Sequence, residues 1–233
     1  MHRFRKSIGW LYAVALIVMA IFVVLAAYTN VPTAPNSKDE LVFESLGFSL
    51  GSGLDASFDD QVALIRKVQF EIFKVAPLGA PIPDYSTREP ADLIRHGQGQ
   101  CYDRSRTLEK AFLYLGLESR HVFIIFKENL PFWRAVFKRE QRSHAITEVK
   151  TSKGWLFVDS NMQWIALTRS GEPVDADGVW RQFSELDNPP PYLNNPWWAV
   201  RGMYSRKGQF YGAGIPFPEF NWHDFLTWFV LPQ

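Results

Sequence analysis

A single cysteine, Cys101, follows a glycine-rich approach and opens a stretch with helical periodicity, and no other feature of this chain limits its fold as strongly. Beyond it, the apolar residues Leu108, Phe112 and Leu115 repeat with the spacing of one helix face. Gly116 then stands where a helix that begins at the cysteine would end. The pattern therefore predicts a helix with Cys101 in its first turn.

A cysteine in the first turn of a helix lies near unpaired backbone N–H groups and the positive end of the helix dipole, and both favour its thiolate. A free cysteine is more often a small buried apolar residue, but Cys101 is flanked by glycine and glutamine instead of an apolar run. Because it is the only cysteine, the chain can form neither an internal disulfide nor a cysteine-based metal cluster. We predict that Cys101 is a nucleophile.

The N-terminal region contains no charged residue from Ile8 to Tyr28. About 20 apolar residues, at ~1.5 Å each, cross the ~30 Å hydrocarbon core of a bilayer. The basic residues before this run should stay in the cytoplasm, which would put the remaining chain outside it, in a periplasmic or extracellular position. A cleaved signal peptide is the alternative, although its apolar core usually has only ~7–15 residues. We expect residues 1–28 to form a cytoplasmic tail and one uncleaved transmembrane helix.

Composition then divides the remaining chain. Proline and asparagine in residues 29–40 predict a short linker, and residues 41–170 contain the expected core, which includes a helix at 59–75. Residues 171–233 are aromatic and interrupted by prolines, so we expect an extension that wraps the core with little regular structure. Residues 127–142 predict an excursion over one face, a lid or a membrane-surface element, with a solvated loop as the plainer alternative.

Charge and histidine spacing exclude other classes of site. The net charge is +1, and because three of the 25 basic residues precede the apolar run, the 24 acidic residues slightly outnumber the rest. Such a body lacks the basic surface that nucleic acid requires, so no nucleic-acid partner is expected. No two histidines lie three or four positions apart, and no dense acidic loop suits calcium. We expect no metal and no cofactor.

Two stretches rich in β-branched and aromatic residues, Ser143–Val149 and Trp155–Asp159, predict a β-hairpin. If the turn is symmetric about Thr151–Ser152, His144 lies opposite Asp159, with Cβ atoms ~4.5–5.5 Å apart. A slip of one residue would put the two side chains on opposite faces of the sheet. The count therefore predicts a hydrogen bond between His144 and Asp159.

Four blocks in this order closely resemble the transglutaminase-like superfamily: residues 89–101, 116–122, 144–149 and 154–160. The resemblance extends from about Asp59 to Trp164. It implies an α+β, papain-like fold in which a cysteine-bearing helix packs on an antiparallel sheet that carries the histidine and the aspartate. Two positions depart from the usual pattern, since Ser105 stands where members often have alanine and Ile146 where an aromatic residue is frequent.

The resemblance also implies a mechanism. Cys101 would attack a carboxamide or peptide carbonyl of a protein or peptide substrate, His144 would act as general acid and base, and Asp159 would hold the imidazole. The acyl-enzyme would be resolved by an amine, which gives cross-linking, or by water, which gives deamidation or proteolysis. A cysteine acyltransferase and a cysteine peptidase or amidase both remain open.

The backbone N–H of Cys101 is the natural oxyanion donor. Gln98, Gln100 and Tyr102 are the further candidates for oxyanion or substrate contacts, although either glutamine could simply hydrogen-bond the turn. A non-catalytic scaffold that binds a peptide or glycan in an aromatic groove is the alternative function. An intact set of Cys101, His144 and Asp159 argues against it, because their joint role is chemical.

Overall fold

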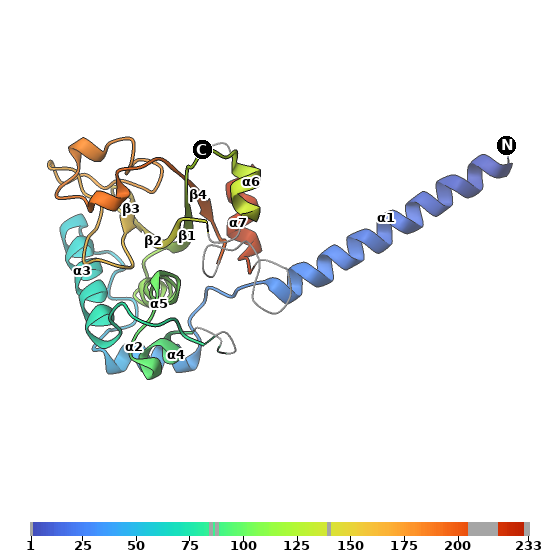
Figure 1. Cartoon of the computed structure of the whole chain (residues 1–233). Helices are drawn as coiled ribbons and strands as arrows, with labels where there is room; N and C mark the ends of the chain where they lie inside the picture. The colour runs from blue at the N-terminus through green and yellow to red at the C-terminus, as the bar shows by residue number, and fades with distance from the viewer. Residues whose placement is uncertain (1, 84–85, 87–88, 139–140, 205–218, 231–233) are drawn as a thin grey trace.

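The computed structural model describes residues 2–83, 86, 89–138, 141–204 and 219–230, and the statements below refer to these residues. The first helix, α1 (His2–Thr29), projects away from a body that contains every other element (Figure 1). Its side chains are described at positions 10 and 12–28, and the large apolar ones among them are mostly exposed. Within these described residues, no helix combines the length and the apolar character needed to cross a membrane.

The body is organised around an antiparallel sheet of four strands in the order β3-β2-β1-β4. The strands are β1 (Ser119–Phe126), β2 (Ser143–Thr151), β3 (Gly154–Val158) and β4 (Trp197–Arg201). The two central strands, β1 and β2, are buried along almost their whole length because both faces of the sheet are covered. With its surrounding helices this is the α+β arrangement, with an antiparallel sheet, that the sequence predicts.

The helix that carries the cysteine, α5 (Cys101–Tyr114), packs against β1 and β2. Leu108, Phe112 and Leu115 are fully buried in one apolar cluster with residues of β2 and β3. Gly116 follows with φ of 82°, a left-handed conformation that glycine adopts readily. The predicted start, apolar face and end of this helix are confirmed.

Three further helices surround α5: α2 (Ser37–Ser45), α3 (Phe58–Val75) and α4 (Pro90–His96) (Figure 1). The helix α3 begins one residue before the predicted position, where the backbone N–H of Asp60 donates to the side chain of Ser57. Pro90 occupies the first turn of α4, where its missing N–H costs no helical hydrogen bond.

The segment expected as a linker is instead part of the body. Asn36 caps α2 by accepting from the N–H of Lys38 at 2.9 Å. Asp39 in the first turn is fully buried and pairs with Lys110 of α5 at 2.7 Å. Asparagine and proline are as typical of a helix start as of a linker, so composition alone did not separate the two.

The C-terminal extension contributes more regular structure than expected. The strand β4 pairs with β1 and closes one side of the sheet, and α7 (Trp222–Val230) follows. Between β3 and β4 the chain is mostly irregular, with two short 3₁₀ turns at Phe183–Glu185 and Pro191–Leu193. Residues 205–218 of the predicted extension, which contain Pro216 and Pro218, lie outside the described residues.

The predicted excursion at 127–142 contains a short helix, α6 (Phe132–Phe137). Ala135 and Val136 of α6 are buried in a cluster with residues of β1 and β4, whereas Trp133 is exposed. Residues 139–140 of the excursion lie outside the described residues. The segment therefore contains a short helix that packs on the sheet, which the expectation of a solvated loop missed.

The hairpin of β2 and β3 has a register two residues away from the predicted one. Thr151 pairs with Gly154, so the turn consists of Ser152 and Lys153 instead of Thr151 and Ser152. Gly154 follows this turn with φ of 133°, a conformation that glycine adopts readily. Because side chains alternate with a period of two, a shift of two residues keeps His144 and the residues around position 159 on their expected side.

Candidate active site

The position of Cys101 is fixed by the loop that leads into α5. The carboxylate of Asp103 accepts from the backbone N–H of Gln100 at 2.9 Å and from that of Ile82 at 3.3 Å. A Cβ on Gly99 would lie 2.6 Å from Cδ1 of Leu93 and 3.0 Å from Cβ of Asp103, so a larger residue here would force these side chains to shift. The half-buried thiol consequently opens the helix, with the backbone of Tyr102 and Ala145 hydrogen-bonded to it.

His144 and Asp159 meet beside this thiol. Nε2 of His144 lies 3.1 Å from Oδ1 of Asp159, and the imidazole also hydrogen-bonds the thiol of Cys101. Both His144 and Asp159 are buried. Asp159 follows directly after β3, on the same side of the sheet as His144. The predicted hydrogen bond is therefore present, although the predicted register was wrong.

Electrostatics in this cluster favour a charged pair. Burial alone raises the pKa of Cys101, but the hydrogen bond and the charge of His144 outweigh it and hold that pKa below its ordinary value. Burial lowers the pKa of His144, yet Asp159 and then Cys101 raise it to about 10. Asp159 is itself kept ionised, because the charge of His144 outweighs the effect of burial and lowers its pKa. The arrangement favours a thiolate beside an imidazolium at neutral pH.

Three residues that sequence reasoning missed hold Asp159 in place. The backbone N–H of Asn161 donates to Oδ1 of Asp159 at 2.7 Å, and the hydroxyl of Tyr192 donates to Oδ2. Gln69 of α3 donates its amide to the backbone carbonyl of Asp159 at 2.7 Å. The ring of Tyr192 also meets His144 edge-on, with centroids 5.7 Å apart. Asn161 could have been found from its closeness in sequence to Asp159, whereas nothing in the sequence marks Gln69 or Tyr192.

Arg104 brings a buried positive charge to the same region. It lies one turn along α5 from Cys101, its guanidinium is 4.6 Å from the ring centroid of Phe73, and Nη2 donates to Oδ1 of Asn161 at 2.7 Å. Burial lowers the pKa of Arg104, while the charges of Cys101 and Asp159 oppose that shift. Its spacing from Cys101 on the predicted helix was the available signal.

The other candidates from the sequence have different roles. Nε2 of Gln100 donates to the carbonyl of Gly79 at 2.5 Å, and the side chain of Gln98 lies against the same glycine. Both described amides thus hold the loop before α5. Tyr102 has a buried side chain, and its backbone is what reaches the thiol of Cys101.

The unusual Ser105 also has a structural explanation. It lies fully buried between α5 and the sheet, where its hydroxyl donates to the carbonyl of Ile146 at 2.7 Å and lies 2.9 Å from Nδ1 of His121. A hydroxyl here attaches α5 to β2, the strand that also carries His144. Ser105 therefore faces the sheet and not a substrate.

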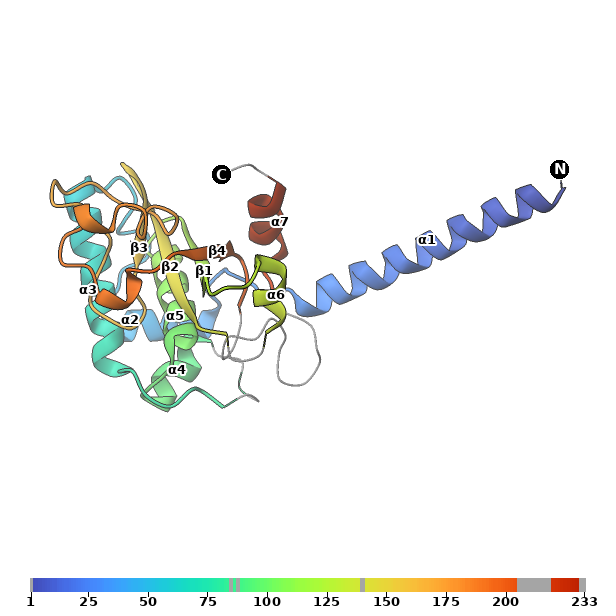
Figure 2. The same cartoon turned by 45° about the horizontal axis from the view of Figure 1, so that its top comes forward.

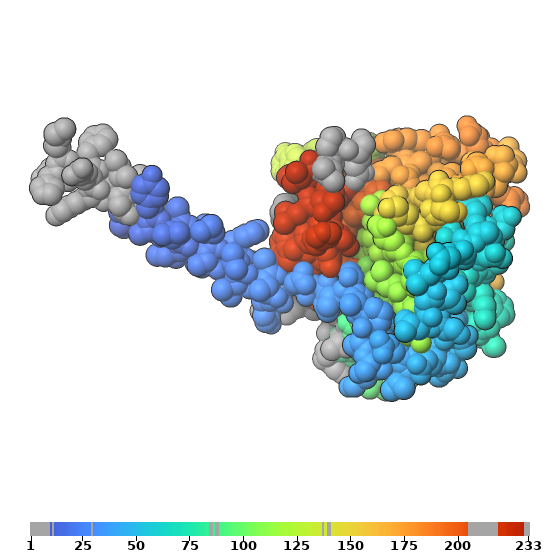
Figure 3. Space-filling model, turned by 180° about the vertical axis from the view of Figure 1, so that it is seen from behind, coloured from blue at the N-terminus to red at the C-terminus, as the bar shows by residue number. Residues whose placement is uncertain are grey.

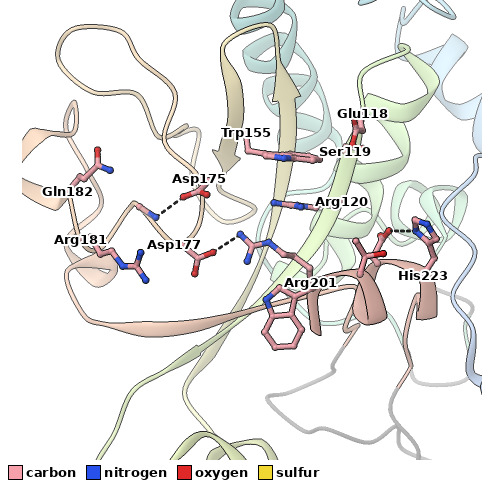
Figure 4. Close-up of a pocket in the computed structure, with 14 residues that line it drawn as sticks. Glu118, Ser119, Arg120, Trp155, Asp175, Asp177, Arg181, Gln182, Arg201 and His223 are labelled. Atoms are coloured by element: carbon pink, nitrogen blue, oxygen red, sulfur yellow. Dashed lines mark hydrogen bonds and ion pairs between the residues drawn. The ribbon is translucent and has the colours of Figure 1, made fainter. Parts of the chain in front are cut away.

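A cavity of about 830 Å³ lies apart from these residues, among β1, β3, β4, α7 and the loop after residue 174 (Figure 4). Arg120 stacks on Trp155 at 3.8 Å within it, and Arg201 pairs with Asp177 at 2.7 Å. Both arginines also pair with the buried Glu148. Since these charges satisfy one another and the cavity is not lined by the cysteine, histidine or aspartate, we place the candidate active site at Cys101.

Comparisons with known proteins address the same region. Residues 51–160, which contain Cys101, His144 and Asp159, match the family model described as "Transglutaminase-like superfamily". A solved structure described as "Crystal structure of a TGase" is similar at 19% identity, with a TM-score of 0.33, over 66% of this chain and 37% of that chain. No curated protein matches.

Proposed function

We propose that this chain is a transglutaminase-like cysteine enzyme that acts on a carboxamide or peptide bond of a protein or peptide substrate. The observation that carries the proposal is the hydrogen-bonded series from the thiol of Cys101 through His144 to Asp159, with the pKa of the thiol lowered and that of the imidazole raised. The match of residues 51–160 to the family model supports the same reaction class.

In the proposed reaction, the thiolate of Cys101 attacks the carbonyl carbon and the carbonyl oxygen becomes an oxyanion near the N–H groups at the start of α5. The carbon–nitrogen bond then breaks, and His144 gives its proton to the departing ammonia or amine. Water or a second amine attacks the thioester, His144 takes the proton, and the thiolate leaves. Asp159 stabilises the imidazolium and fixes the orientation of the ring throughout.

Alkylation of the thiol tests this proposal without a known substrate. Iodoacetamide at neutral pH should label Cys101 much faster than it labels an ordinary free thiol, and His144→Ala should remove the advantage. Cys101→Ser, which nearly conserves volume, is the control for labelling elsewhere. A rate equal to that of an unperturbed thiol would refute an activated nucleophile.

We further propose that α1 is a membrane anchor and that the body lies outside the cytoplasm. The sequence from Ile8 to Tyr28 contains no charge, and the described apolar side chains of α1 are exposed where the helix leaves the body. Sedimentation of membranes at high salt and at alkaline pH tests this, because an inserted helix resists extraction and a peripheral protein does not.

A binding function without catalysis is favoured by one separate observation. A cavity of about 350 Å³ is lined by Trp180, Trp197, Trp198 and Trp228, a composition suited to a peptide or glycan. A scaffold of this kind would bind its partner equally well after Cys101→Ser and would show no rapid alkylation. The enzyme proposal expects rapid alkylation, so the labelling rate separates the two functions.

A further inference from the structure

The helix α7 covers the body with one face and leaves another uncovered. Phe225 and Trp228 pack against the apolar cluster at the ends of β1 and β4. Leu226, Phe229 and Val230 are exposed, with exposed fractions of 47%, 72% and 71%, although Phe229 also contacts the ring of Phe225 and lines the tryptophan cavity. This nine-residue helix therefore presents apolar side chains away from the body as well as toward it, and no element among the described residues covers Leu226 and Val230.

The start of α7 is attached to the base of α1. The backbone N–H of Val31 donates to the carbonyl of Phe220 at 2.7 Å, and the N–H of Trp222 donates to the side chain of Asn30 at 3.2 Å. The ring of Phe22 in α1 meets that of Trp222 edge-on at 5.8 Å. The space-filling view from behind shows α7 directly beside the base of α1 (Figure 3).

These contacts fix the depth of α7 relative to α1. Phe22 precedes Tyr28, the last residue of the uncharged run, by six positions, which is about 9 Å at ~1.5 Å per residue. If α1 spans a bilayer, the backbone of Trp222, bonded to Asn30, therefore lies near the boundary between acyl chains and headgroups, and its ring, against Phe22, reaches into the outer acyl chains. Both ribbon views show α7 running across the direction of α1, which is how a helix lies in the plane of a membrane (Figures 1 and 2).

The neighbouring helix α6 adds tryptophan and positive charge to the same side of the body (Figure 2). Its Phe132 meets Trp228 of α7 with centroids 6.5 Å apart. Trp133 is 60% exposed, and the guanidinium of Arg134 lies 4.9 Å from the centroid of its ring. Residues 127–142 contain five basic and two acidic residues, a balance that attracts anionic headgroups.

We propose that this α6–α7 face, defined by Trp133, Leu226, Phe229 and Val230, rests on the surface of a bilayer that contains anionic lipid. The inference depends on the proposed anchor, since α1 is what brings the face to the membrane. It would fix the orientation of the body, so that Cys101 is held at a constant height and angle above the lipid.

Spin labels on the full-length protein test the contact. In a Cys101→Ser background, single cysteines are placed at Leu226, Phe229, Phe70 and Val18, and each protein is reconstituted in vesicles of phosphatidylcholine and phosphatidylglycerol. Phe70 on α3 is the matched control, because its exposed fraction of 47% equals that of Leu226 and α3 lies on the side of the body away from α1. Collision rates with oxygen and with a water-soluble nickel complex are measured for each label.

Bilayer contact should raise the oxygen collision rate and lower the nickel rate at 226 and 229, while the label at 70 stays accessible to nickel. High nickel accessibility at 226 and 229, with the label at 18 buried in lipid, would overturn the α6–α7 contact and leave the anchor standing. Low collision rates with both reagents would overturn it in favour of a protein partner or second copy. A label at 18 exposed to water would refute the anchor and, with it, this inference.

Discussion

His144 is the residue on which the charge of Cys101 depends most. After His144→Ala, burial continues to raise the pKa of the thiol while the main opposing contribution is lost, so that pKa should rise above its ordinary value. Each unit of increase lowers the thiolate fraction at neutral pH about tenfold. Iodoacetamide rates measured across a range of pH should show the inflection moving to higher pH. An unchanged inflection would mean that His144 does not control the thiol.

Tyr192 should affect the acid end of the same pH profile, that of the rate of alkylation by iodoacetamide. Its hydroxyl is one of the groups that keep the pKa of Asp159 below the ordinary value, so Tyr192→Phe should raise that pKa. Protonation of Asp159 would then weaken the charged pair at a higher pH, and the acid limb of the alkylation profile should shift upward. Tyr204→Phe is the matched control, because Tyr204 donates to Glu109 at 2.6 Å instead. If both variants shift the acid limb equally, Tyr192 contributes to packing and not to the pKa of Asp159.

The expected members of the site could be predicted because each carries a local signal. Cys101 opens a helix, and His144 and Asp159 stand at countable positions of a hairpin. The register count nevertheless missed by two residues, and the same-face outcome survived only because the error was even. Tyr192 and Gln69 could not be foreseen, since their hydrogen bonds to Asp159 join segments far apart in sequence.

At the scale of elements, Glu148 connects three parts of the sheet. Its buried carboxylate on β2 pairs with Arg120 of β1 and Arg201 of β4, and it accepts from the N–H of Ala176 at 2.8 Å. Removal of one partner from a buried ionic network typically costs about 3–5 kcal/mol. Glu148→Ala should lower the free energy of unfolding, measured by chemical denaturation, by an amount of that order. The control is the exposed pair of Lys150 and Glu118. Glu118→Ala should change the free energy of unfolding little.

The ionisation of Glu148 also determines how the free energy of unfolding should depend on pH. Burial alone raises the pKa of Glu148, but Arg201 and then Arg120 outweigh it and hold that pKa below the unfolded value. A lowered pKa of an acid contributes stability above the unfolded pKa of about 4.3, and the contribution is lost as the pH falls through the folded value. The difference in free energy between the natural protein and Glu148→Ala should therefore narrow below about pH 4. A constant difference would contradict this role of ionisation.

Helices were easier to predict here than strand order. The starts and ends of α3, α4 and α5 follow from caps, proline and glycine that act within a few residues. The pairing of β4 with β1 joins positions about 75 residues apart, as in Ile124 with Ala199, and no local pattern encodes it. Proline-rich surroundings concealed β4, although Pro196 directly before the strand is a permitted position.

For the whole molecule, two truncations test where the body begins. Removal of residues 1–28 should leave a folded protein in the supernatant after membranes are sedimented, with the unfolding midpoint little changed. Removal of residues 1–45 also takes away Phe43, which is fully buried, and Asp39, the partner of Lys110. The longer truncation should lose several kcal/mol of stability, since the loss of one buried phenylalanine side chain alone costs about 3–5 kcal/mol. Equal stability of the two proteins would show that residues 29–45 contribute nothing to the stability of the body.

Tyr192 and β4 follow all three residues of the candidate site along the chain, and this order has a consequence for synthesis. A growing chain that already carries Cys101, His144 and Asp159 still lacks the hydroxyl on Asp159 and the strand beside β1. The thiol therefore reaches its final environment only after translation has passed residue 201.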